Sequence, residues 1–175
     1  MRPNVIRART QILTQQAREK LGQMLLLFGM TAMLLLGGAM HAQTVRIPLP
    51  NSNFPISQGI WVGDTLYLSG MMSSTLSTLS PGDTKEQTIS AIKQIQQALE
   101  AQKLTLGDVV MMHVYLAGDT AKGGKMDFAG FMAGYTQFFG TKDQPNKPAR
   151  SAMQVAALAA PAGLVEIEVI AVRPK

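Results

Sequence analysis

The chain has 175 residues, of which 46% are hydrophobic, and it carries 16 basic and 11 acidic side chains. This length accommodates one domain, alone or with a processed segment, and the hydrophobic content excludes a mostly disordered chain. The absence of cysteine excludes disulfides, thiolate metal sites and cysteine nucleophiles. Residues 1–42 hold five basic side chains and one acidic side chain, whereas residues 43–175 hold eleven and ten. The domain therefore lacks the basic excess typical of nucleic-acid binding, and we expect no nucleic-acid partner.

Residues 1–42 have the layout of an export segment. A basic leader precedes the uncharged residues 24–36, and small residues follow them. This order is typical of a secretory signal peptide, with cleavage after Ala42 or Ala39. If uncleaved, residues 24–40 are barely long enough for a membrane anchor, and a buried N-terminal helix is the third alternative. We expect an exported, periplasmic protein that meets the membrane only through this segment.

Residues 43–53 contain prolines and polar side chains and predict an extended lead-in to a domain over residues 54–175. Two β-rich runs follow, residues 56–62 and 65–70, and the Gly-Asp pair between them predicts a hairpin. A loop rich in Ser, Thr and Gly continues to residue 82.

Two amphipathic helices are predicted next. Thr84 and Gln87 have the spacing of a capping box, and isoleucines at helical spacing extend the first helix to about residue 102. Asp127 is placed to cap the second helix, whose aromatic side chains share one stripe. Between the helices, residues 109–116 read as a strand that is apolar on both faces.

Two final strands, residues 150–156 and 165–172, complete the order β-β-α-β-α-β-β. This order predicts an α+β fold with two helices packed on one face of one mixed sheet. Because the strand at residues 109–116 is apolar on both faces, the second face needs a partner. Self-association is the simplest one.

The final strands carry the residues best suited to chemistry. Glu166 and Glu168 share one face of their strand, and Arg150 opens the preceding strand. An arginine fork binds a planar carboxylate through two parallel hydrogen bonds, and a nearby glutamate can hold a water or act as a base. The spacing lets Arg150 approach either glutamate, within one chain or across a subunit contact. A structural ion pair is the alternative interpretation.

His113 lies in mid-strand among apolar neighbours. We interpret it as a buried, hydrogen-bonded core or interface histidine, with a catalytic base as the alternative. The His, Asp and Glu residues of the domain lack metal-ligand spacing, and no G-x-S-x-G elbow is present. We therefore expect no metal site and no hydrolase triad.

Seven segments of the domain form a pattern when they are taken in chain order. They are residues 55–59 (PISQG), 67–70 (YLSG), 87–88 (QT), 107–110 (GDVV), 135–139 (YTQFF), 148–151 (PARS) and 165–172 (VEIEVIAV). Together they resemble the Rid family, the YjgF-like or RidA-like deaminases of reactive intermediates. The resemblance covers roughly residues 54–173, and the combination of PARS with the VEIEVIAV ending is its most specific part.

The resemblance implies a chorismate-mutase-like α+β fold, assembled as a homotrimer with ligand sites in clefts between subunits. It implies hydrolysis of enamines and imines such as 2-aminoacrylate to 2-keto acids and ammonia, without metal or cofactor. Arg150 matches the arginine that grips the substrate carboxylate, and Glu166 matches the carboxylate associated with the hydrolytic water. Gly70 matches a glycine whose backbone lines the pocket.

Four positions depart from the family pattern. Ile56 stands where the family has tyrosine, Ala152 where it has cysteine, Met132 where it has asparagine and Met71 where it has glutamine. The matches still place Ile56 and Ala152 at substrate-binding positions. The more apolar pocket favours an alternative function, a non-catalytic protein of the same fold that binds a small carboxylate or acts as an interaction protein. The retained arginine and glutamate favour the enzyme.

Overall fold

The computed structural model describes residue 15, residues 18–22 and residues 43–174, and residues 18–22 are helical. Apart from residue 15 and residues 18–22, the predicted export segment at residues 1–42 lies outside the described residues, and so does its possible membrane anchor at residues 24–40. The chain divides into two units, Met1–His41 and Ala42–Lys175, of which the second holds the sheet. Across residues 18–22 and 43–174, no helix has the length and apolar content needed to cross a membrane.

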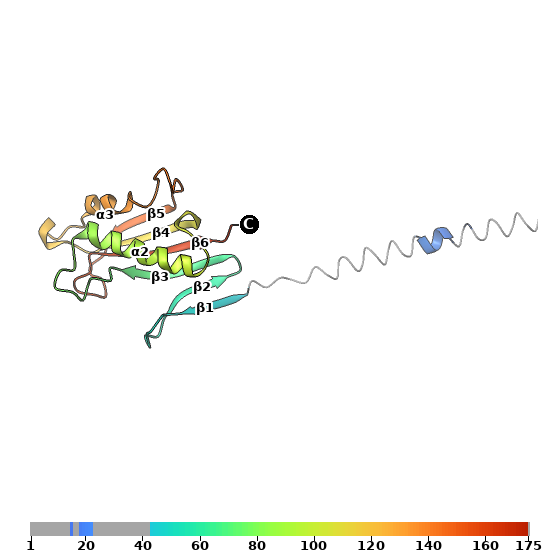
Figure 1. Cartoon of the computed structure of the whole chain (residues 1–175), viewed down its shortest axis with the longest axis horizontal. Helices are drawn as coiled ribbons and strands as arrows, with labels where there is room; N and C mark the ends of the chain where they lie inside the picture. Colours follow the sequence, from blue (N-terminus) through green and yellow to red (C-terminus); the bar gives the residue numbers. More distant parts are fainter. Residues whose placement is uncertain (1–14, 16–17, 23–42, 175) are drawn as a thin grey trace, which may run out of the picture. The chain divides into compact units, whose positions relative to one another are not determined.

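The second unit consists of a mixed sheet and two α-helices (Figure 1), which confirms the predicted α+β class. Neighbouring strands in the order β1-β2-β3-β6-β4-β5 are antiparallel, except that β4 and β5 are parallel. The elements are β1 (Thr44–Pro48), β2 (Ser57–Val62), β3 (Thr65–Met72), α2 (Thr84–Ala101), η1 (Leu106–Asp108), β4 (Val109–Leu116), η2 (Thr120–Lys122), α3 (Phe128–Tyr135), β5 (Ala149–Gln154) and β6 (Val165–Val172).

The N-terminal lead-in contributes a strand that the sequence analysis did not predict. β1 pairs with β2 and forms one edge of the sheet. The hairpin between β2 and β3 is as predicted, with Val62 opposite Thr65. Gly63 in its turn has φ of 59°, in the left-handed region that glycine adopts without strain.

The core lies between one face of the sheet and the two helices. Alternate side chains of β4 and β6 point into it and are buried, as are the apolar residues on one face of α2. Examples are Met112, Val114, Leu116, Val165, Ile167, Ile92, Ile95 and Leu99. The helices pack so closely that a Cβ atom at Gly134 of α3 would lie 2.8 Å from Cβ of Thr88 on α2. A glycine is therefore required where they meet.

The second face of the sheet is open, because within the described residues both helices pack on the core face. On β4, Met111, His113 and Tyr115 point to this open face and are half-buried, and Val110 is 47% exposed. The predicted strand therefore has one buried face and one that carries polar groups. Of the two locations predicted for His113, the core is wrong for the single chain, since the alternation of β4 turns it away from the helices. The interface stays a prediction, and the predicted hydrogen bond is formed with Glu168.

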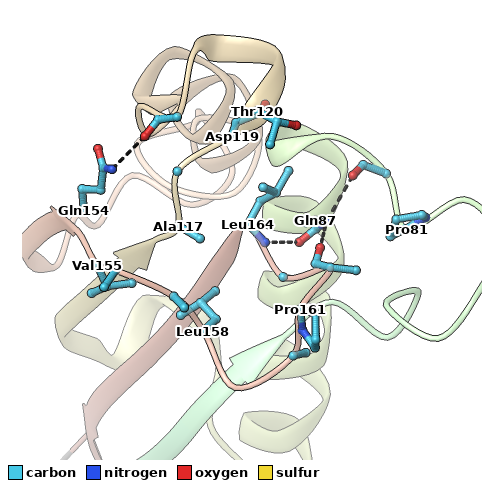
Figure 2. A pocket seen from close by; sticks show the side chains of 18 residues that line it. Pro81, Gln87, Ala117, Asp119, Thr120, Gln154, Val155, Leu158, Pro161 and Leu164 are labelled. Carbon is cyan, nitrogen blue, oxygen red and sulfur yellow. Dashed lines mark hydrogen bonds between the residues drawn. The ribbon is translucent and has the colours of Figure 1, made fainter.

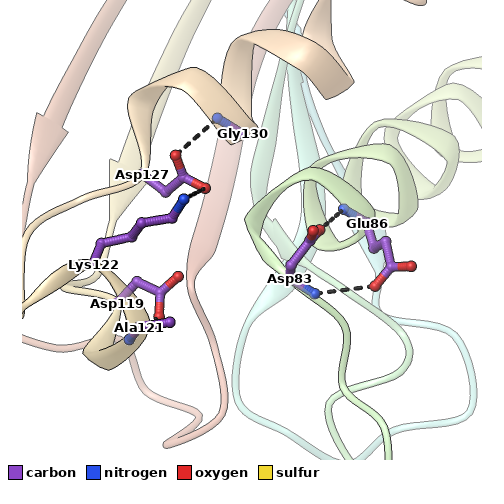
Figure 3. A network of polar contacts seen from close by, with 7 residues as sticks. All are labelled: Asp83, Glu86, Asp119, Ala121, Lys122, Asp127 and Gly130. Atoms are coloured by element: carbon purple, nitrogen blue, oxygen red, sulfur yellow. Dashed lines mark hydrogen bonds and ion pairs between the residues drawn. The ribbon is translucent and has the colours of Figure 1, made fainter.

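The helix caps differ from the prediction in one case. Asp83 caps α2, since its carboxylate accepts the Glu86 N–H at 2.8 Å and the Glu86 carboxylate accepts the Asp83 N–H at 3.1 Å (Figure 3). The predicted box at Thr84 is wrong by one residue, because aspartate is the stronger cap. Asp127 caps α3 as predicted, accepting the Gly130 N–H at 3.0 Å.

Gln87, which was predicted to complete the capping box, instead ties the β5–β6 loop to α2. Its fully buried side chain donates to the Ala162 carbonyl at 2.9 Å and accepts the Leu164 N–H at 2.8 Å (Figure 2). Long-range bonds of this kind hold the loop before β6, and thus help to position the strand that carries the two glutamates.

Candidate functional site

Glu166 and Glu168 lie on the open face of β6, as the alternation predicted, while their neighbours on the strand are buried. Glu168 is anchored by β4: its Oε1 accepts hydrogen bonds from Nδ1 of His113 at 2.8 Å and from the Tyr115 hydroxyl at 2.9 Å. Because an ionised carboxylate only accepts, His113 presents its Nδ1–H to Glu168. The three side chains form a connected polar network on the open face.

The electrostatics of this face favour proton transfer at Glu166. Burial raises the pKa of Glu166 above its usual range, and the negative charge of Glu168 raises that pKa further. The hydrogen bond to Glu168 raises the pKa of the Tyr115 hydroxyl, so that this group stays a donor. A carboxylate with a raised pKa is a stronger base toward water, which suits Glu166 for general base catalysis.

Gly70 faces Glu166 from the neighbouring strand β3. The β3–β6 register is irregular between Leu68 and Met71, and Gly70 lies at this irregularity. A Cβ atom at Gly70 would lie 2.8 Å from Cδ and 3.0 Å from Cγ of Glu166. The bare glycine backbone thus makes room for the carboxylate, and the structure brings these two predicted site residues together.

Arg150 lies on the other side of the sheet, under α3. It is opposite Met112 in the parallel β4–β5 register, and Met112 is fully buried on the helix face. The guanidinium carbon lies 4.4 Å from the ring centre of Tyr135 and 5.0 Å from that of Phe131. Its Nη1 is buried and has no hydrogen-bond partner. A buried N–H group without an acceptor is costly, so this arrangement favours an anionic ligand.

A cavity of about 550 Å³ opens beside Arg150, which we call the Arg150 cavity. Its walls come from α3, the turn after it and the segment that leads into β5. It is lined by Met132, Tyr135, Thr136, Phe139, Gly140, Lys147, Pro148 and Arg150. Because this lining includes two cations and no carboxylate, the cavity is suited to an anion.

An ion pair between Arg150 and Glu166 or Glu168 within one chain, which the sequence allowed, is wrong. The register places the arginine on the helix face, whereas the glutamates are on the open face. Ala152 shares the face of Arg150 and packs against the core. Ile56 lies just before β2 and is 49% exposed. The single chain thus brings Gly70 and Glu166 together on the open face and Arg150 and Ala152 together on the helix face.

A second cavity, of about 530 Å³, lies between the ends of β4 and β5, the β5–β6 loop and the start of α2 (Figure 2). Three of its polar side chains, those of Gln87, Asp119 and Gln154, already form hydrogen bonds within the fold. Gln154 donates to the Gly124 carbonyl at 3.0 Å, and Asp119 accepts the Ala121 N–H at 2.8 Å (Figures 2 and 3). Since no cation lines it, we place the candidate site at the Arg150 cavity.

Sequence reasoning missed two parts of the site. The aromatic stripe of α3 was predicted without any role in the site, yet Phe131 and Tyr135 form the wall against which Arg150 lies. The polar network of β4 was missed because only His113 was considered. A signal was present, since His113 and Tyr115 alternate with buried residues. Across residues 18–22 and 43–174, His, Asp and Glu form no group of three that could hold a metal ion.

Residues 48–173 match the family model described as Endoribonuclease L-PSP. A RutC family protein of Saccharolobus solfataricus is 40% identical over 130 residues, which are 73% of this chain and 93% of that protein. A 2-iminobutanoate/2-iminopropanoate deaminase of Capra hircus is 37% identical over 121 residues, 68% of this chain and 80% of that protein. The crystal structure of E. coli TdcF with bound serine is 30% identical, with a TM-score of 0.59 over 76% of this chain and 98% of TdcF.

Proposed function

Because the chain belongs to the Endoribonuclease L-PSP family, whose members include proteins named as imine deaminases, we propose that it hydrolyses reactive enamines and imines of amino acids to 2-keto acids and ammonia. The family membership confirms the resemblance to the Rid proteins. The observation that carries the proposal is Arg150, a guanidinium held against aromatic rings beside a cavity, with a buried Nη1 that lacks an acceptor. Imines derived from amino acids bring the carboxylate that this group lacks.

The proposed reaction needs few catalytic groups from the protein. An enamine such as 2-aminoacrylate tautomerises to the imine, water adds to the C=N carbon, and the resulting carbinolamine expels ammonia to leave the keto acid. Arg150 holds the substrate carboxylate and draws electron density away from the C=N carbon. Glu166 takes a proton from the attacking water and returns one to the departing nitrogen.

A site that uses both residues needs two protomers, because Arg150 and Glu166 lie on opposite faces of one sheet. We propose a homotrimer in which the open face of one protomer lies against the Arg150 edge of the next. The exposed apolar side chains of this face, including Tyr67, Met153 and Val172, support association.

We expect residues 43–175 to sediment as a trimer at micromolar concentration, because the open face and the Arg150 edge are complementary in charge. An Arg150→Glu variant places a like charge against Glu166 and should shift the equilibrium toward the monomer. Analytical ultracentrifugation of both proteins measures this. A wild-type chain that stays monomeric at this concentration would contradict the two-protomer site.

The proposed reaction is tested by ammonia release from freshly generated 2-aminoacrylate and 2-iminobutyrate, with the spontaneous rate subtracted. We expect the hydrolysis rate to rise in proportion to protein concentration. The alternative function, a non-catalytic carboxylate-binding or interaction protein, predicts no acceleration. It still allows saturable binding of a 2-keto acid in calorimetry, so the two functions are separated by the same pair of measurements.

A Gly70→Ala variant is expected to lose activity while keeping its fold. The added methyl group displaces the Glu166 carboxylate, and a displacement of about 1 Å in a catalytic group can cost up to about a hundredfold in rate. We expect kcat/KM to fall by roughly ten- to a hundredfold. Gly107→Ala is the matched control, because a Cβ atom there meets its nearest neighbours at 3.4 Å. Equal activity of the two variants would argue against Glu166 as a site residue.

A further inference from the structure

The walls of the Arg150 cavity are apolar apart from its cations. Met132 and Tyr135 come from α3, Phe139 from the turn after it and Pro148 from the segment before β5. The only side-chain hydroxyl beside that of Tyr135 belongs to Thr136, and it donates to the Met132 carbonyl at 3.0 Å. Within one protomer, the lining holds no side-chain amide or carboxylate, and in the proposed trimer the Glu166 carboxylate comes from the neighbouring protomer.

The second cation, Lys147, contributes its methylene chain to the wall of the cavity more than it contributes its charge. Gly140 has φ of 72°, and a Cβ atom there would lie 2.8 Å from Cε of Lys147. The stem of Lys147 thus lies across the turn, while the residue as a whole is exposed. A lysine in this position covers apolar surface and keeps its ammonium in water. Arg150 is therefore the one cation of the lining with a buried, unpartnered donor.

We propose that the Arg150 cavity selects imines whose side chain is apolar and several atoms long, such as those derived from methionine or leucine, over 2-aminoacrylate and over imines with polar side chains. The proposal rests on the proposed function, which places the substrate carboxylate on Arg150. With the carboxylate there, the side chain enters a cavity of about 550 Å³ between Met132 and Phe139. Along the wall formed by Met132 and Phe139, a polar side chain would give up hydrogen bonds to water without replacement, and a one-carbon side chain would leave most of this wall unused.

Met132 is the residue that determines which imine side chains the Arg150 cavity accepts. It is half-buried on α3, in the same lining as Arg150. Its flexible thioether chain fits varied apolar side chains. An asparagine at this position would supply an amide toward the ligand and remove part of the apolar wall.

The test compares ammonia release from imines generated in situ by an amino-acid oxidase from alanine, methionine and glutamine. Methionine and glutamine have side chains of similar length and opposite polarity. We expect kcat/KM for the methionine imine to exceed both others by roughly tenfold or more. Met132→Asn should bring the methionine-to-glutamine ratio to within about threefold, while Met132→Leu should preserve it. Leu79→Asn, at a fully exposed loop position, is the control and should change nothing.

Equal rates for the three imines, or a ratio that survives Met132→Asn, would overturn the inference and leave the proposed function intact. If no imine is accelerated, the proposed function fails instead. Calorimetry then decides the inference alone: 4-methyl-2-oxopentanoate should bind roughly tenfold more tightly than pyruvate, and equal affinities would overturn it.

Discussion

We expect Arg150→Lys to lower kcat/KM for imine hydrolysis by roughly ten- to a hundredfold, because a charge-assisted hydrogen bond contributes about 1.5–3 kcal/mol. An ammonium cannot reproduce the two-pronged contact of the guanidinium with a carboxylate, nor its stacking on Tyr135. The thermal midpoint should fall only slightly, because the substitution weakens the stacking on Tyr135 but removes no hydrogen bond of Nη1 within the fold. Ammonia release and thermal unfolding, measured on the same preparation, give both quantities.

Arg173→Lys is a matched control. Arg173 also stacks on an aromatic ring, with its guanidinium carbon 4.3 Å from the ring centre of Trp61, and its Nη1 lies 4.0 Å from Oδ1 of Asp64. Its contacts are structural, so its substitution should leave kcat/KM unchanged. If Arg150→Lys instead lowered the thermal midpoint and left the activity per folded protein unchanged, Arg150 would be a structural residue and the interaction-protein alternative would be favoured.

Glu166→Gln should lower kcat/KM by about a hundredfold, at the lower end of the range for a lost general base, because imine hydrolysis is already fast in water. The pH profile is the more specific result. Glu166 acts only when ionised, and burial together with the charge of Glu168 raises its pKa. In the wild-type protein, kcat/KM should therefore fall as the pH drops through this raised pKa, at a higher pH than for an ordinary glutamate.

Glu168→Gln separates the two causes of the raised pKa. It removes the neighbouring charge and leaves the burial, so the acidic limb of the kcat/KM profile should move to lower pH without reaching that of an exposed glutamate. Glu166→Gln should remove the limb altogether. If the acidic limb of the kcat/KM profile persisted unchanged in Glu166→Gln, the titrating group would be another residue. Glu166 would then not be the general base. The spontaneous hydrolysis rate must be measured at every pH.

The sequence by itself determined what depends on neighbours along the chain. The alternation of β6 placed Glu166 and Glu168 on one face with Val165, Ile167 and Val169 on the other, because side chains of a strand have a period of two whatever the strand pairs with. The helix that Asp127 caps and the hairpin at Gly63 followed in the same way from local signals. The family motifs, which are also local strings, identified the fold.

The tertiary structure decided what depends on pairing between distant segments. Whether Arg150 meets Glu166 depends on the register of β5 on β4, and a shift of one residue would have reversed its face. The role of Gln87 depended on the loop 75 residues away that it holds. Residues 44–48 form a strand because their backbone pairs with the free edge of β2. Local propensity cannot encode these choices, since they are made by hydrogen bonds and side-chain packing between segments that meet only in the fold.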